Sequence, residues 1–185
     1  MITLSPAEHV LVKDAFSLLV GEPLSDMWRY AGYQVFEFGE QVPEVNTKGV
    51  EITRGMLSLT SLYWKLRGPN RFSLGSRNFG SSGRRDGHAE GFYGMVEAGA
   101  LTVETLDVSE LGAISLGMSG GFSLDFFING RVSKLGYQWQ YSYRREGSEK
   151  RMVLCGGSLD LDFCPVGSEI GGVLLRRKDV PESQG

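Results

Sequence analysis

Three side chains that could do chemistry alternate along one glycine-rich segment: Asp86, His88 and Glu90. On an extended backbone, residues two apart point to the same side, so two carboxylates and an imidazole would converge. Such a set could bind a metal ion or exchange protons with a substrate. The preceding Arg84 and Arg85 would add positive charge beside it. We take these five residues as the candidate binding residues of the chain.

The sequence offers few further ligands for a metal ion at this segment. The chain has two histidines and two cysteines: His9, His88, Cys155 and Cys164. Tight transition-metal sites draw on these two residue types, whereas carboxylates with one imidazole bind magnesium or calcium weakly. Residues 75–91 also hold five glycines and two apolar residues, which predicts a long surface loop. We therefore expect no metal, no cofactor and no catalytic residue.

Residues 117–121 have the Gly-x-Ser-x-Gly spacing of a nucleophile elbow, with Ser119 at its centre. The elbow requires a turn from a strand into a helix, and its triad follows the chain order serine, acid, histidine. Here both histidines precede Ser119, and residues 122–128 have strand composition. The pattern therefore predicts a plain hairpin turn.

An aromatic stripe alternates along one predicted strand: Tyr137, Trp139, Tyr141 and Tyr143. Aromatic side chains beside arginines could stack nucleic-acid bases. However, 22 acidic residues against 19 basic ones give a formal charge of −3, which offers no general attraction to phosphate. Such a stripe more commonly forms the core face of a sheet, although the sequence leaves open whether it is core or interface. We expect no nucleic-acid partner.

The elements that must position these residues are one helix and many short strands. Ser5-Pro6-Ala7-Glu8 has the pattern of a capping box, and Gly21 with Pro23 ends a helical period, which predicts a helix over residues 6–20. Apolar alternation predicts strands at residues 33–39, 56–66, 71–75, 101–106, 113–118, 122–128, 137–144, 151–155 and 158–163. We expect an α+β fold, with the N-terminal helix packed on a mainly antiparallel, strongly twisted sheet or partly open barrel.

Length and composition fit one domain over residues 1–185, with residues 176–185 as a solvated C-terminal tail. No stretch approaches the ~18 consecutive apolar residues of a membrane span, and the N-terminus lacks the pattern of a signal peptide. We expect a cytoplasmic protein without a membrane partner. Cys155 and Cys164 make no redox motif, and their redox state stays open.

Several strand segments together carry a resemblance: residues 57–59, 64–66, 74–78, 101–103, 114–116 and 119–127. The pattern, a hydrophobic strand with Trp-Lys followed by a Gly-Ser turn, resembles an uncharacterised family of small bacterial β-rich proteins. The resemblance implies no activity; similar small proteins often sit beside toxins as immunity partners. Asn78 stands where an aspartate is commoner, which argues against a catalytic role there.

These observations favour a non-enzymatic module that binds another protein, of the bacterial immunity type. The alternative is a small-ligand-binding protein or enzyme with its site near residues 75–91. The sequence does not decide whether the protein is an enzyme, although the absence of a complete catalytic motif favours the binding module. It leaves open the identity of the partner or ligand and whether the chain forms a homo-oligomer.

Overall fold

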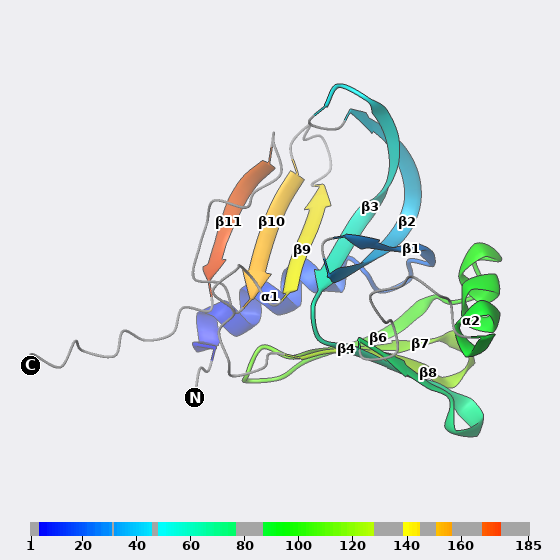
Figure 1. The fold of residues 1–185 in the computed structure, drawn as a ribbon. Coiled ribbons are helices and arrows are strands. Elements are labelled where there is room, and N and C mark those ends of the chain that lie inside the picture. The colour runs from blue at the N-terminus through cyan, green and yellow to red at the C-terminus, as the bar shows by residue number, and fades with distance from the viewer. Residues whose placement is uncertain are drawn as a thin grey trace, which may run out of the picture.

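The computed structural model describes residues 4–30, 32–45, 48–76, 87–127, 139–144, 151–156 and 168–174. In these ranges the chain forms two β-sheets with a helix beside each (Figure 1). The helices are α1 (Pro6–Ser17) and α2 (Gly87–Glu97). The α+β class with mainly antiparallel sheets is confirmed.

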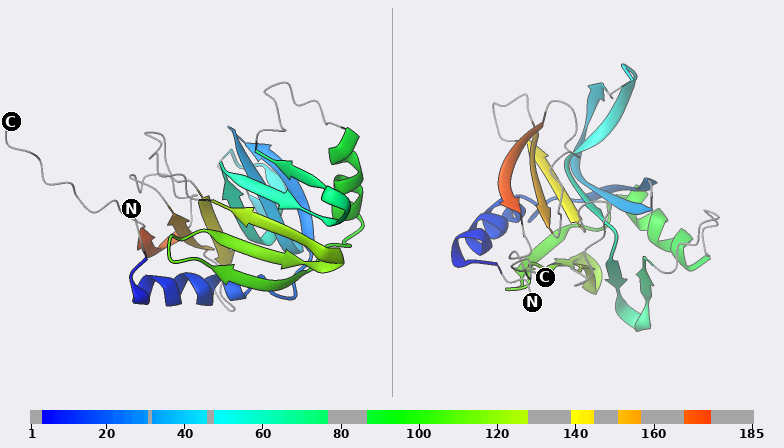
Figure 2. Two further views of the ribbon diagram at one scale, coloured as in Figure 1. Left: turned by 90° about the horizontal axis from the view of Figure 1, so that it is seen from below. Right: turned by 60° about the vertical axis from the view of Figure 1, so that its left-hand side comes forward.

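The first sheet has six strands, in the order β1 (Leu24–Tyr30), β2 (Tyr33–Val45), β3 (Glu51–Ser61), β9 (Trp139–Arg144), β10 (Arg151–Gly156) and β11 (Ser168–Leu174). All neighbours are antiparallel except β10 and β11, which run parallel. The second sheet has five, in the order β5 (Ser73–Gly75), β4 (Trp64–Arg67), β8 (Phe122–Phe126), β7 (Ile114–Met118) and β6 (Val103–Val108). It lies across one end of the first sheet (Figures 1 and 2).

The segment at residues 56–66 reads as one strand in the sequence but serves both sheets. It ends β3 at Ser61 and starts β4 at Trp64. Between them the chain turns, and the Tyr63 carbonyl accepts hydrogen bonds from the Ser61 hydroxyl (3.1 Å) and from the backbone N–H of Phe127 (2.9 Å). The change of sheet therefore depends on a contact with residue 127, which is remote in sequence.

Helix α1 begins with the predicted capping box. The backbone N–H of Ser5 donates to Glu8 Oε2 (2.7 Å), and the N–H of Glu8 donates to Ser5 Oγ (3.3 Å). The helix ends at Ser17, three residues before the predicted end, and a turn then leads to Gly21, whose φ is +94°. Its buried face carries Phe16, which packs on the first sheet.

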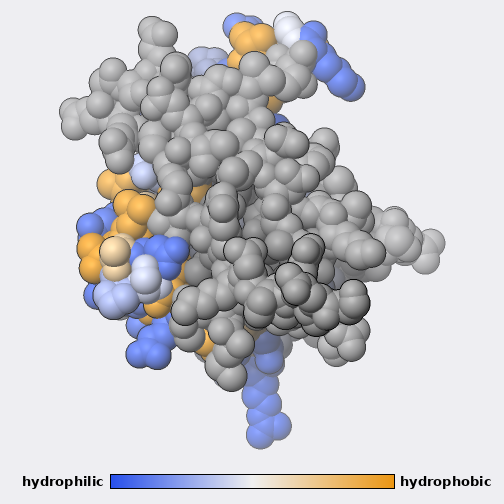
Figure 3. Space-filling view, turned by 90° about the vertical axis from the view of Figure 1, so that its left-hand side faces the viewer, coloured by the Kyte–Doolittle hydropathy of each residue, from blue (hydrophilic) through white to orange (hydrophobic). Residues whose placement is uncertain are grey.

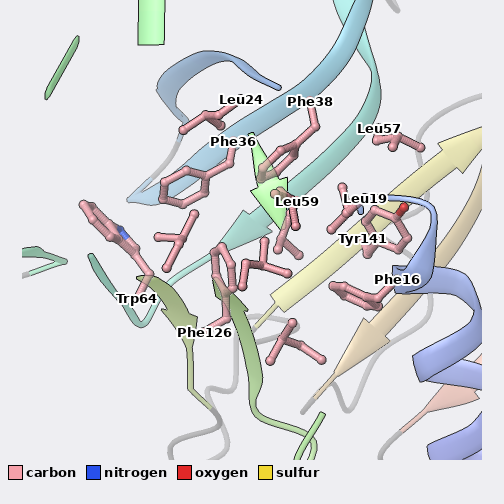
Figure 4. Close-up of a cluster of buried hydrophobic side chains, with 14 of the residues drawn as sticks. Phe16, Leu19, Leu24, Phe36, Phe38, Leu57, Leu59, Trp64, Phe126 and Tyr141 are labelled. Atoms are coloured by element: carbon pink, nitrogen blue, oxygen red, sulfur yellow. The ribbon is translucent and has the colours of Figure 1, made fainter. Parts of the chain in front are cut away.

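A single core joins both sheets and both helices (Figure 4). Phe36 of β2 contacts two rings of the second sheet edge-on, Trp64 at 5.2 Å and Phe126 at 5.3 Å between ring centroids. Because these rings come from three different strands, they fix how the sheets meet.

The described part of the aromatic stripe is core. Trp139 and Tyr141 are fully buried and Tyr143 nearly so, while Tyr137 lies outside the described residues. Phe16 stacks on Tyr141 with 4.3 Å between centroids, and Tyr143 stacks on Tyr141 from its own strand at 5.2 Å. Burial of Trp139 and of Trp64 follows the sequence pattern, in which large aromatics alternate along strands.

Helix α2 replaces the end of the loop predicted at residues 75–91. Three of its residues are glycines, which hide the helical period in the sequence. The period is visible only at Phe92 and Val96, four residues apart and both buried. The helix therefore owes its position to packing: Phe92 lies against Phe72 and Phe122. The predicted strand at residues 158–163 and tail at 176–185 lie outside the described residues.

Candidate functional site

The residues singled out from the sequence do not form a described site. Arg84, Arg85 and Asp86 lie outside the described residues. His88 and Glu90 lie in the first turn of α2, where residues two apart are separated by about 200° around the axis, so the extended backbone assumed for them was wrong. Glu90 is exposed to solvent.

Ser119 is held as part of a turn, as predicted. Its hydroxyl donates to the carbonyl of Ala100 (2.9 Å) and accepts from the backbone N–H of Thr102 (2.9 Å). Gly120 and Gly121 follow with φ of +71° and +76°, the left-handed conformation that allows β7 to turn into β8. Both bonds of the hydroxyl go to backbone groups, so its role is structural.

The most distinctive surface of the described chain is the far end of the hairpin formed by β2 and β3. The ladder between β1 and β2 ends at Phe38, and the ladder between β3 and β9 ends at Leu57. Beyond these points β2 and β3 continue to pair with each other as far as Val45 and Glu51. We call residues 40–45 and 48–56 the arm; it extends past the neighbouring strands (Figures 1 and 2).

The arm carries exposed apolar side chains. Val45 is 63% exposed and Val50 is 54% exposed, and Met56 at its base is 38% exposed. Figure 3 shows hydrophobic and hydrophilic residues together at the upper end of the molecule, the end that the arm forms in Figure 1. Exposed apolar side chains on a projecting element are available for burial against another surface.

A buried carboxylate lies at the base of the arm. Glu37 of β2 is 1% exposed, in a strand that lies between β1 and β3. Its Oε2 accepts from the backbone N–H of Gly55 (3.0 Å) and from Nε2 of Gln41 (3.2 Å). Its Oε1 accepts from Nε1 of Trp28 (3.0 Å) and from Nη1 of Arg54 (3.4 Å). Four donors thus compensate the burial of this carboxylate.

Neighbouring groups extend this network to β1. The Arg54 guanidinium lies over the indole of Trp28, 4.2 Å from the ring centroid. Gln41 Nε2 also donates to the hydroxyl of Ser25 (2.9 Å), which in turn donates to the Glu37 carbonyl (3.1 Å). The network therefore joins two residues of β1, Ser25 and Trp28, to three residues of the arm through Glu37.

Two glycines lie at the same level as this carboxylate, one on each strand. Gly39 has φ of +75° and lies where the register between β2 and β3 shifts. At Gly55 a Cβ atom would lie 2.8 Å from Cβ of Glu37 and 3.1 Å from backbone atoms of Phe38. Both positions therefore require glycine, for conformation in one strand and for close approach in the other.

This site is suited to holding structure rather than to catalysis. Both oxygens of Glu37 are engaged by donors, so neither faces a substrate. The second sheet has a similar arrangement: Asp125 accepts from Ser115 Oγ (2.5 Å) and from Nη2 of Arg67 (2.5 Å). Within the described ranges, no three residues of the types His, Cys, Asp and Glu gather closely enough to hold a metal ion.

The sequence analysis did not find Glu37. A glutamate between Phe36 and Phe38 indicates the solvent face of a half-buried strand, because neighbouring side chains point to opposite faces. The available signal was the isolated glycines at positions 39 and 55, since a glycine inside a strand pattern indicates a bulge or a close approach of backbones.

Comparison with known proteins gives no relative. No family model, no curated protein and no solved structure matches the chain. Neither helix in the described ranges is both long and apolar enough to cross a bilayer.

Proposed function

We propose that the protein is a non-enzymatic module that binds another protein, of the immunity type, and that the arm is its contact surface. The observation that carries the proposal is the exposure of Val45 and Val50, 63% and 54%, on a hairpin that extends past its neighbours. Burial of such side chains against a partner would remove apolar surface from water, the main favourable contribution to association.

The arm is also held in place before any partner binds. A two-stranded hairpin alone is marginally stable in water. Here the base is fixed by the four hydrogen bonds that Glu37 accepts. A rigid element loses less conformational entropy when it binds than a mobile one. This rigidity favours a docking role over a solvated extension.

The charge of the arm favours a partner with basic groups around an apolar centre. The arm carries three glutamates, Glu40, Glu44 and Glu51, against two basic residues, Lys48 and Arg54, and Arg54 also pairs with Glu37. The whole chain has a formal charge of −3. Complementary charge at the rim of an interface mainly sets orientation and association rate.

Paired serine variants test the proposal. The full chain, the arm variant Val45→Ser/Val50→Ser and the control Val10→Ser/Val20→Ser are immobilised and exposed to extract of the source cells. Val10 and Val20 are 57% and 46% exposed but lie on α1 and the turn after it, so the control removes similar apolar surface elsewhere.

We expect the immobilised wild type and the control to retain the same second protein from the extract. The arm variant should retain at least tenfold less of it. Equal retention by all three forms, equal loss from both variants, or retention of nothing by the wild type would each reject the arm as the contact surface.

A further inference from the structure

We propose that Glu37 acts as a latch that sets the direction of the arm, and is in this way a positioning residue for partner binding. The binding part of this inference rests on the function proposed above. The latch itself is a property of the isolated chain and is tested there.

The base of the arm is built as a hinge. Gly39 in β2 adopts φ of +75°, and Gly55 in β3 pairs with Gln41, immediately beyond the register shift. Each strand thus has one residue without a side chain at the level where the arm leaves the sheet. Backbone rotation at these two positions meets little steric resistance from their own side chains, as expected of hinge residues.

The carboxylate of Glu37 closes this hinge by bonding to both sides of it. Trp28 Nε1, on β1, belongs to the body of the sheet and donates to Oε1 at 3.0 Å. The Gly55 N–H and Gln41 Nε2, on the arm, donate to Oε2 at 3.0 and 3.2 Å. Because the group is 1% exposed, water does not compete for these bonds while the arm is in place.

Glu37 is too deeply buried to touch a partner, so its effect on binding must pass through the arm. With the latch closed, Val45 and Val50 are held in one arrangement relative to the sheet. With the latch open, the arm samples several directions, and the partner must select one of them. The apparent affinity falls in proportion to the fraction of molecules in that arrangement.

Hydrogen exchange of the isolated full-length chain tests the latch. Glu37→Ala removes both acceptor oxygens, and Glu37→Gln keeps one of them. Asp125→Asn is the matched control, because Asp125 is also a buried carboxylate that accepts from an arginine and a hydroxyl, but in the second sheet. Amides of the arm are compared with amides of β7 and β8 in the same molecule.

We expect amides of residues 40–45 and 50–55 to exchange at least tenfold faster in Glu37→Ala, with β7 and β8 unchanged, and to be unaffected in Asp125→Asn. If amides of β7 and β8 also exchange faster in Glu37→Ala, the same comparison between the arm and these two strands is made in the milder variant Glu37→Gln. Unchanged arm amides in a variant that keeps β7 and β8 protected would overturn the latch. Failure of the arm to bind a partner would leave this exchange result unaffected, so the two proposals fail separately.

Discussion

The backbone N–H of Gly55 donates a hydrogen bond to Glu37 Oε2 at 3.0 Å, across two strands and eighteen positions of sequence. A strand glycine and a charged side chain are both unfavourable in a buried sheet when taken singly. Here each compensates for the other, because the missing side chain of Gly55 leaves room for Cβ of Glu37 and the Gly55 amide donates to the carboxylate. This pair fixes the base of the arm.

Gly55→Ala tests how tight this approach is. The added methyl would lie 2.8 Å from Cβ of Glu37 and 3.1 Å from backbone atoms of Phe38, so strands must shift. We expect a loss of about 1–3 kcal/mol in the free energy of unfolding, measured by chemical denaturation. Gly94→Ala is the control: this exposed helical glycine has open space around it, and alanine there should stabilise by about 0.5–1 kcal/mol. A neutral Gly55→Ala would show that β3 lies farther from Glu37.

Trp139→Ala tests the core beneath α1. The indole is fully buried, meets Phe16 edge-on at 5.4 Å and donates from Nε1 to the carbonyl of Gly112 at 3.1 Å. We expect the free energy of unfolding to fall by about 3–5 kcal/mol in urea denaturation. A loss below about 1 kcal/mol is typical of a surface residue and would place Trp139 outside the core.

We expect Tyr141→Phe to leave the free energy of unfolding nearly unchanged at neutral pH and to reduce its loss in alkali. Among the buried side-chain nitrogen and oxygen atoms of the described residues, the Tyr141 hydroxyl alone has no hydrogen-bond partner, so its removal leaves no other group unsatisfied. Burial raises the pKa of this hydroxyl well above its usual 10.0, and the charges of Tyr143 and Glu22 raise it further.

The raised pKa determines in which direction stability changes with pH. Above about pH 10 the unfolded chain ionises Tyr141 while the folded chain does not, so this contribution to stability is present below pH 10 and is lost as the pH rises above it. Unfolding free energies measured at pH 8 and at pH 11 should therefore differ less in Tyr141→Phe than in the wild type. Equal pH dependence in both proteins would show that the hydroxyl ionises freely in the folded state.

The two residues of the ion pair in the second sheet should contribute unequally to the free energy of unfolding. The Arg67 side chain is 57% exposed, whereas that of Asp125 is 6% exposed and also accepts from Ser115. Arg67→Ala should cost less than about 1 kcal/mol, because water solvates much of the guanidinium. Asp125→Ala should cost about 1–3 kcal/mol, since it leaves the Ser115 hydroxyl without its acceptor. Equal losses in thermal or urea denaturation would contradict this description.

The parts of the fold that depend on local pattern were predictable. The capping box of Ser5 and Glu8 starts α1, the alternation of Trp139, Tyr141 and Tyr143 marks a core strand, and the glycines after Ser119 mark a turn. Each of these signals lies within a few residues of the feature it predicts.

The parts that were missed depend on contacts between distant residues. The division into two sheets depends on the turn at Tyr63, which bonds to Phe127. Helix α2 depends on the packing of Phe92, because its glycines weaken the local signal. Glu37 is buried because its donors Gly55 and Trp28 lie in neighbouring strands. The isolated glycines at positions 39 and 55 indicate a close approach of backbones, but not which side chain is buried there. The arm was therefore not visible as a candidate site in the sequence.

Photo-crosslinking at the arm is the most direct test of its role in binding. A photoreactive p-benzoylphenylalanine is placed at position 45 in one protein and at position 10 in another, where Val45 and Val10 have similar exposure, 63% and 57%. After irradiation in the source cells, we expect position 45 to give one discrete adduct with a second protein and position 10 to give none of it. The same adduct from both positions, or no adduct from position 45, would contradict the arm as the partner-binding surface.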